Sequence, residues 1–181
     1  MTLEIFEKKV EKVYKSIVWS HKIQEKDADY NAAIYKFIEF FNILTLALSS
    51  TGIVSIYITD WAITDRKGEW ITLTTLIVSF IGLLLTLIVK TWDFKTNAYQ
   101  HKEAALNLLE LRNDFYDLIM EIESLKNTNS EEDTIQELEK TYNELIPKLE
   151  EVHKKTPMYS KHALKKAEKE LKCNNTWLNI K

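Results

Sequence analysis

The sequence of 181 residues is poor in cysteine, glycine and proline, and each shortage excludes something. The single cysteine, Cys173, rules out an internal disulfide and fits a reducing compartment. Three glycines are too few for a glycine-rich phosphate-binding loop. No glycine or proline precedes Gly52, so nothing interrupts a helix over the first fifty residues. The composition therefore favours long helices in a reduced protein.

Recognisable catalytic and metal-binding patterns are also absent. The motifs HExxH, CxxC and GxSxG do not occur. The four histidines are His21, His101, His153 and His162, and none has metal-ligand spacing to a second ligand on one helical face. His101 is expected to form a hydrogen bond between helices or at the depth of the lipid headgroups. We therefore expect a protein that is not an enzyme and uses no metal or cofactor.

Charge is missing from two blocks of twenty residues, 40–59 and 70–89. At about 1.5 Å per residue, a helical block of this length matches the hydrocarbon core of a bilayer. Tyr57, Trp61, Trp70 and Trp92 lie at the ends of the blocks, where interfacial aromatics are expected. The alternative, two buried helices of a soluble bundle, would need a large protein shell to cover them. The sequence therefore predicts a two-span membrane hairpin.

The predicted class is an all-α membrane protein with long cytoplasmic helices and an antiparallel helical hairpin. The expected segments are a cytoplasmic N-terminal helix (1–39), the first span (40–59), a short external loop (60–69), the second span (70–89), a cytoplasmic hairpin (90–156), and a basic C-terminal helix and tail (157–181). The first 36 residues lack the apolar core of a cleavable signal peptide. Lysine and arginine counts near the spans differ only slightly, so the large charged segments decide that both termini are cytoplasmic.

The cytoplasmic segments carry apolar residues at helical spacing. An N-terminal stripe, Leu3, Phe6, Val10, Val13 and Ile17, predicts a helix that runs into the first span. Two further stripes, here termed the hairpin seams, are Leu108, Leu111, Phe115, Leu118, Ile122 and Leu125, and Ile135, Leu138, Tyr142, Leu145, Leu149 and Val152. Their equal length predicts an antiparallel hairpin. They appear too numerous for one hairpin to bury, which favours a homo-oligomer, with a tetramer preferred.

Local signals mark the ends of these helices. No glycine or proline breaks the chain from the second span to the end of the first hairpin arm. Ser130 and Asp133 have the spacing of a helix-capping box before the second arm. Pro147 should kink or break that arm, and Pro157 should end it. Ser160 is expected to cap a last helix.

Small and mildly polar residues recur along one face of each span at steps of three and four. This span seam comprises Asn42, Thr45, Ser49 and Gly52 in the first span and Thr72, Thr75, Ser79, Gly82 and Thr86 in the second. Small residues let helices approach closely in lipid, so the two halves can pack on each other. Alternatively, one half lines a water-filled pore formed by several hairpins, since one hairpin cannot enclose a channel. Exposure to lipid is a third alternative, because a hydroxyl can bond to its own backbone.

Charge is unevenly distributed over the cytoplasmic segments. Residues 103–151 contain 14 acidic and 4 basic side chains, whereas residues 154–172 contain 7 basic and 2 acidic ones. The candidate site for an anion or nucleotide is the basic face made by Lys161, His162, Lys165, Lys166, Lys169 and Lys172. This last helix is expected to dock on the acidic hairpin or on a neighbouring subunit. The alternative is that the charges only solvate the surface or pair with each other.

The order of helix, span, short loop, span, long helix and hairpin resembles the SLATT family of bacterial two-span membrane proteins. FKTNAYQHKEAALNLLELR (residues 94–112) is similar to the helix that follows the second span in that family. TPMYSKHALKKAEKEL (residues 156–171) is similar to its proline followed by a basic, alanine-rich helix. The similarity covers residues 14–172; the net-acidic hairpin and Pro147 depart from the family pattern.

The resemblance implies a pore-forming effector of the bacterial inner membrane that acts in antiviral defence. It further implies that a partner nucleotidyltransferase or related sensor makes a nucleotide or oligonucleotide signal that gates the membrane part. The expected output is membrane depolarisation, with cell arrest or death, as in abortive infection. The residues by themselves leave two alternatives, a gated pore or a membrane-anchored helical interaction module without conductance.

Overall fold

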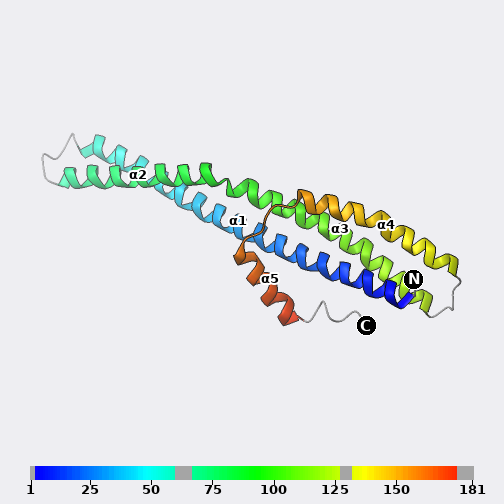
Figure 1. The fold of residues 1–181 in the computed structure, drawn as a ribbon. Coiled ribbons are helices and arrows are strands. Elements are labelled where there is room, and N and C mark those ends of the chain that lie inside the picture. The colour runs from blue at the N-terminus through cyan, green and yellow to red at the C-terminus, as the bar shows by residue number, and fades with distance from the viewer. Residues whose placement is uncertain (1–2, 60–66, 127–131, 175–181) are drawn as a thin grey trace. The chain divides into compact units, whose positions relative to one another are not determined.

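The computed structural model describes residues 3–59, 67–126 and 132–174. They form α1 (Leu3–Thr59), α2 (Lys67–Trp92), α3 (Phe94–Lys126), α4 (Glu132–Lys155) and α5 (Lys161–Asn174), shown in Figure 1. No strand occurs within these ranges, so the predicted all-α class is confirmed. The chain divides into two compact units, one of residues 1–30 and 98–181 and the other of residues 31–97.

The first unit is a bundle of α3, α4 and the N-terminal half of α1, which lie side by side (Figure 1). Its buried core consists of Phe6, Val10 and Ile17 from α1, Leu108, Leu111, Phe115, Leu118, Ile119 and Ile122 from α3, and Leu138, Tyr142, Leu145 and Leu149 from α4. The Tyr142 ring packs edge-on against Phe6 and Phe115, at centroid distances of 5.7 and 6.1 Å. The apolar stripes read from the sequence therefore form one three-helix core.

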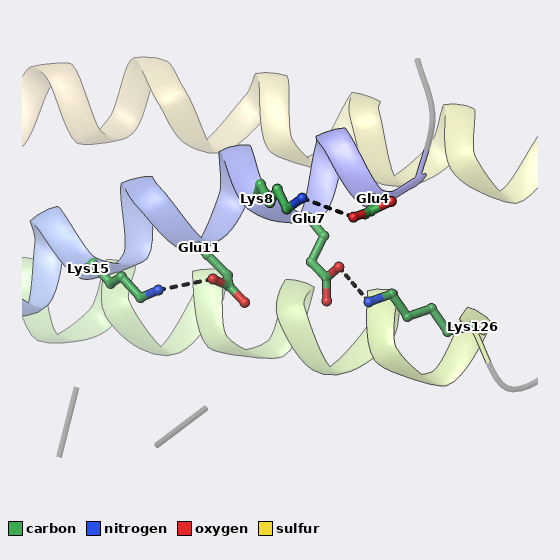
Figure 2. Close-up of polar contacts among 6 residues, drawn as sticks. All are labelled: Glu4, Glu7, Lys8, Glu11, Lys15 and Lys126. Atoms are coloured by element: carbon green, nitrogen blue, oxygen red, sulfur yellow. Dashed lines mark hydrogen bonds and ion pairs between the residues drawn. The ribbon is translucent and has the colours of Figure 1, made fainter. Parts of the chain in front are cut away.

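Charged side chains of α1 form ion pairs within the helix and with α3 (Figure 2). Lys15 pairs with Glu11 along the helix at 3.0 Å, while Lys126 of α3 reaches Glu7 of α1 at 2.5 Å. Both pairs are partly exposed, and ion pairs near the surface add little stability, about 0–1 kcal/mol each. Apolar burial therefore orients α1, and the charges keep its other face in water.

The end of α4 and the start of α5 agree with the turn signals. Pro147 lies inside α4, which continues through it, so the expected break does not occur. Helix α4 ends at Lys155, just before Pro157. The Ala163 N–H donates to the Ser160 hydroxyl at 3.1 Å, which confirms Ser160 as the cap of α5. The capping box predicted at Ser130 lies outside the described residues.

The predicted docking of α5 on the acidic hairpin is wrong. The buried Ala163 and Ala167 pack with Ile23 of α1, and Trp19 and Leu164 lie against the same cluster. Two α1 lysines, Lys22 and Lys26, pair with Glu170 of α5 at 3.1 and 2.7 Å. The small alanines let α5 approach α1 closely. This apolar face determines where α5 docks, although its net charge had suggested the acidic hairpin.

The second unit consists of the C-terminal half of α1, α2 and the start of α3. Both α1 and α2 contain a segment long and apolar enough to cross a membrane, and only 11% and 6% of the residues in the two most apolar windows are buried. Phe40, Leu76 and Leu83 are among the large apolar side chains that remain exposed. A soluble core helix would be mostly buried, so the exposure favours lipid as the surroundings.

The chain between α2 and α3 corrects the expectation of an unbroken helix after the second span. Asp93 adopts a positive φ of 37° and separates the two helices. Aspartate tolerates this left-handed region better than most residues, and its carboxylate accepts a hydrogen bond from the Thr96 N–H at 3.3 Å. A helix cap thus interrupts the chain where no glycine or proline is present.

Candidate functional site

The structure brings the two halves of the span seam together within one chain. The Asn42 side-chain amide lies 3.2 Å from the Thr86 hydroxyl. The Ser79 hydroxyl lies 3.1 Å from the Ser49 hydroxyl. Between these polar pairs, the Thr45 side chain is buried against Gly82. From one contact to the next, the residue number increases along α1 and decreases along α2. The two helices are therefore antiparallel.

Four hydroxyls of the seam also bond to their own helix. Thr45, Ser49, Ser79 and Thr86 all donate to the carbonyl four residues earlier, at 2.7 to 2.9 Å. Such back-bonding satisfies a hydroxyl in an apolar environment without a water molecule. Thr75 is half-buried on the same face, whereas the predicted seam residues Gly52 and Thr72 have side-chain positions outside the described residues.

A second polar cluster, here termed the polar layer, lies in the bundle of the first unit. It consists of Gln24 and Asp27 on α1, His101 on α3, and Pro157 and Ser160 in the segment between α4 and α5. Gln24, Asp27 and His101 are all buried. Sequence reasoning missed the α1 members because the apolar stripe was followed only to Ile17. At the same three- and four-residue steps it continues as Ser20, Gln24 and Asp27, so the change from apolar to polar was the available signal.

Gln24 links all three parts of the layer. Its amide nitrogen donates to the Pro157 carbonyl at 3.2 Å, and its amide oxygen lies 2.6 Å from His101 Nδ1. A carbonyl only accepts hydrogen bonds, so the amide nitrogen has to face Pro157 and the amide oxygen has to face His101. His101 Nδ1 therefore carries the proton and donates to Gln24. The predicted interhelical hydrogen bond of His101 is confirmed.

Asp27 holds the start of α5. The Ser160 N–H donates to one carboxylate oxygen at 2.5 Å, and the Ser160 hydroxyl donates to the other at 2.7 Å. The same hydroxyl accepts from the Ala163 N–H and caps α5. Hydrogen bonds to a charged group contribute about 1.5–3 kcal/mol each. Asp27 therefore fixes the cap as well as the position of α5.

Burial shapes the protonation of two histidines in this unit. Burial lowers the pKa of His101 below its ordinary 6.5, and the nearby Asp27 carboxylate only partly opposes this. Burial and the Arg112 guanidinium likewise lower the pKa of His21, against an opposing effect of Glu25. Both imidazoles are thus held neutral in the folded bundle at neutral pH.

The basic face of α5 is exposed to solvent. Lys161, His162, Lys165, Lys166, Lys169 and Lys172 are all exposed, whereas Ala163 and Ala167 of the same helix are buried against α1. The His162 ring stacks on Tyr30 at 4.6 Å, and Lys172 pairs with Glu168 at 2.5 Å. The structure therefore gathers the predicted anion-binding residues on one accessible surface, but it adds Tyr30 beside them.

The hairpin seams, predicted for the hairpin or for assembly, lie inside one chain. Their fully buried members pack on each other and on α1, and Leu125 and Val152 are partly buried against the same core. Ile135 remains partly exposed. The N-terminal helix thus covers the apolar surface that seemed too large for one hairpin. Any assembly has to use other surfaces.

The fold and the exposed apolar helices define an all-α protein with two candidate membrane-spanning helices. Metal binding finds no support among the described residues, since no group of three or more potential ligands occurs there. The chain belongs to the SMODS and SLOG-associating 2TM effector domain family 4, whose family model matches residues 6–178. This match confirms the resemblance to the SLATT family and makes the protein a membrane effector. No curated protein and no solved structure matches the chain.

Proposed function

We propose that this protein assembles in the bacterial inner membrane into an ion-conducting pore, with both termini in the cytoplasm. The pore would act in antiphage defence and open or close in response to a nucleotide or oligonucleotide made by a partner nucleotidyltransferase or related sensor. Membership in a two-span effector family supports the membrane role. Conduction, gating and the partner enzyme are the proposed parts.

The observation that carries the proposal is the row of amide and hydroxyl groups on the two spans. A plain membrane anchor needs only apolar residues, whereas these helices place Asn42, Ser49, Ser79 and Thr86 along one contact. Ser79 and Thr86 also remain exposed at the edge of that contact. A neighbouring hairpin or a water-filled lumen can reach them there.

Assembly requires surfaces outside the intrachain core. Helix α3 carries Leu106, Tyr116 and Met120 exposed on its outer side, which gives a second chain an apolar face to contact. A tetramer is the preferred size, because few subunits suffice for an ion-sized lumen. The basic face of α5 is the proposed surface for the anionic signal.

The alternative is a membrane-anchored interaction module that does not conduct. One observation favours it: the Thr45, Ser49, Ser79 and Thr86 hydroxyls of the seam each have a hydrogen-bond acceptor within the same chain. In this alternative the seam only locks the two spans together, and the helical bundle binds a partner in the cytoplasm.

Ion flux into liposomes separates the two functions. In the proposed pore, Ser79→Leu should reduce flux several-fold without changing the assembled mass in detergent. The matched control is Ser50→Leu, because Ser50 lies on the exposed side of α1 and its hydroxyl donates to the Ala47 carbonyl of the same helix. A strictly monomeric protein, or a wild type without flux under candidate nucleotides, would leave only the anchored module.

A further inference from the structure

A cavity of about 400 Å³ opens between α1 and the end of α4 with the segment that follows it. Trp19, Ser20, Ile23 and Gln24 of α1 form one wall, and Met158 and Tyr159 lie on the opposite side. The volume falls within the range of about 300–1,000 Å³ that is typical of small-molecule sites. The cavity is separate from the span seam and from the basic face of α5, because no residue of either set lines it.

The cavity has a buried floor and an open rim. Ile23 and Gln24 are each only 2% exposed, whereas Met158 is 95% and Tyr159 is 49% exposed. A ligand can therefore enter past the rim without opening the apolar core of the bundle. The exposed Met158 side chain is flexible and can close over a bound molecule.

The lining defines the chemistry of the ligand. Trp19 and Tyr159 contribute aromatic side chains to the lining, and flat rings stack favourably on such side chains. In the part of the chain that the structure describes, Gln24 uses one of its two amide N–H groups, toward Pro157, so the second can donate to an acceptor on a ring edge. None of the lining residues is lysine, arginine, aspartate or glutamate. The cavity thus suits an uncharged, planar ring with nitrogen or oxygen acceptors at its edge.

The two walls of the cavity are the elements that the polar layer joins. Gln24 binds the Pro157 carbonyl, and Asp27, three residues further along α1, binds Ser160. A ring held between the walls adds contacts to the docked arrangement of this segment that are lost when it separates from α1. By linkage, such a ligand stabilises the docked arrangement.

We propose that this cavity binds a planar, uncharged heteroaromatic ring, such as the base of a nucleoside, and that the bound ring holds the segment between α4 and α5 against α1. This inference rests on the proposed function, in which a cytoplasmic nucleotide controls the spans. It assigns recognition of the ring to the cavity and leaves recognition of phosphate to exposed lysines.

The test uses the full chain in detergent, adenosine as the probe and ribose 5-phosphate as a comparison without a ring. Ser20→Phe fills the cavity, and Ser16→Phe places the same side chain on the exposed face of α1 one turn earlier. Calorimetric titration should show saturable adenosine binding to wild type and Ser16→Phe, and binding at least ten-fold weaker for Ser20→Phe. Ribose 5-phosphate should not bind in the cavity. Adenosine should also slow hydrogen exchange of the Ser160 amide, which bonds to Asp27.

A second variant guards against misfolding of Ser20→Phe. Tyr159 lies at the half-exposed rim outside the apolar core, so Tyr159→Ala should keep the helical circular dichroism of wild type and weaken adenosine binding several-fold. The proposal is overturned if wild type does not bind adenosine, or if folded Ser20→Phe and Tyr159→Ala bind it as tightly as wild type. Liposome flux distinguishes the two proposals: a nucleotide response that persists in Ser20→Phe removes the cavity but keeps the pore. Adenosine binding without any flux supports the proposed binding site and refutes the proposed pore.

Discussion

Gly82→Ala should weaken the contact between the two spans. A Cβ atom at position 82 would lie 2.8 Å from Thr45 Cγ2, whereas two carbon atoms pack best at about 3.5–4.0 Å. The helices therefore have to separate by about 1 Å, or the Thr45 side chain has to rotate. Rotation would move the Thr45 hydroxyl away from the Phe41 carbonyl, to which it donates at 2.7 Å.

The expected cost follows from these two routes. Separation loses the close packing and the flanking Ser49–Ser79 and Asn42–Thr86 contacts, and contacts of this kind in lipid contribute about 1 kcal/mol each. Rotation leaves a hydroxyl without its acceptor, at a cost of about 1–3 kcal/mol. Either route predicts a loss of about 1–3 kcal/mol, which is about ten-fold or more in the association of the spans over most of that range. Helix propensity does not offset this, because separated spans stay helical in detergent.

Disulfide formation within one chain measures the contact. Ser49→Cys and Ser79→Cys, in a Cys173→Ser background, place two thiols at the closest polar contact of the seam. Gly82→Ala should slow cross-linking at protein concentrations where chains do not meet. Adding Thr45→Ser removes Cγ2 and keeps the hydroxyl, so it should restore most of the rate.

Leu83→Ala is the matched control, because its exposed side chain faces away from the contact and the change should leave cross-linking intact. A neutral Gly82→Ala, or a Thr45→Ser change that restores nothing, would refute the packing of these two residues. Cross-linking only between chains would refute the intrachain seam altogether.

Two further predictions concern the polar layer. Asp27→Ala removes both acceptors of Ser160 and should lower the free energy of unfolding of the bundle by about 3 kcal/mol, while Asp27→Asn should cost about half as much; a loss below about 0.5 kcal/mol in denaturant titration would contradict the assigned role. Because the folded pKa of His101 is lowered, the unfolded chain takes up a proton first, so stability should fall as pH drops below about 6.5 until His101 itself is protonated. His101→Gln should reduce the dependence of stability on pH, measured by thermal unfolding between pH 7.5 and 5.5. The pKa of His21 is shifted in the same direction, so adding His21→Gln should reduce the dependence further. An unchanged pH dependence in both variants would show that other groups titrate.

The helices and the bundle core were predictable because periodicity carries them. Leu108, Phe115 and Leu138 occupy the core that their spacing predicts. The register of the span seam was not predictable, since small residues recur at the same steps on both helices and several alignments look alike. Only the structure distinguishes the pairing of Thr45 with Gly82 from its neighbours.

The errors have physical causes. Asp93 went unnoticed as a break because only glycine and proline were considered, although aspartate also adopts positive φ and caps helices. The docking of α5 was assigned by net charge, but Ala163 and Ala167 show that a narrow apolar face decided it. Long-range charge is a weak guide to contacts, because salt screens exposed charges within about 10 Å.

The bundle core changes character along its length, and this has a consequence for signalling. Toward the α3–α4 connection it is apolar, with Phe6 and Ile122 fully buried, so that end holds the helices together by burial. The other end, formed by residues nearest in sequence to the spans, consists of Gln24, Asp27 and His101. Hydrogen-bonded layers have directional contacts that are either made or lost, whereas apolar packing tolerates small shifts. If the proposed signal binds at α5, the hydrogen bonds of the polar end are the contacts it would break or strengthen, while the apolar end keeps the bundle folded.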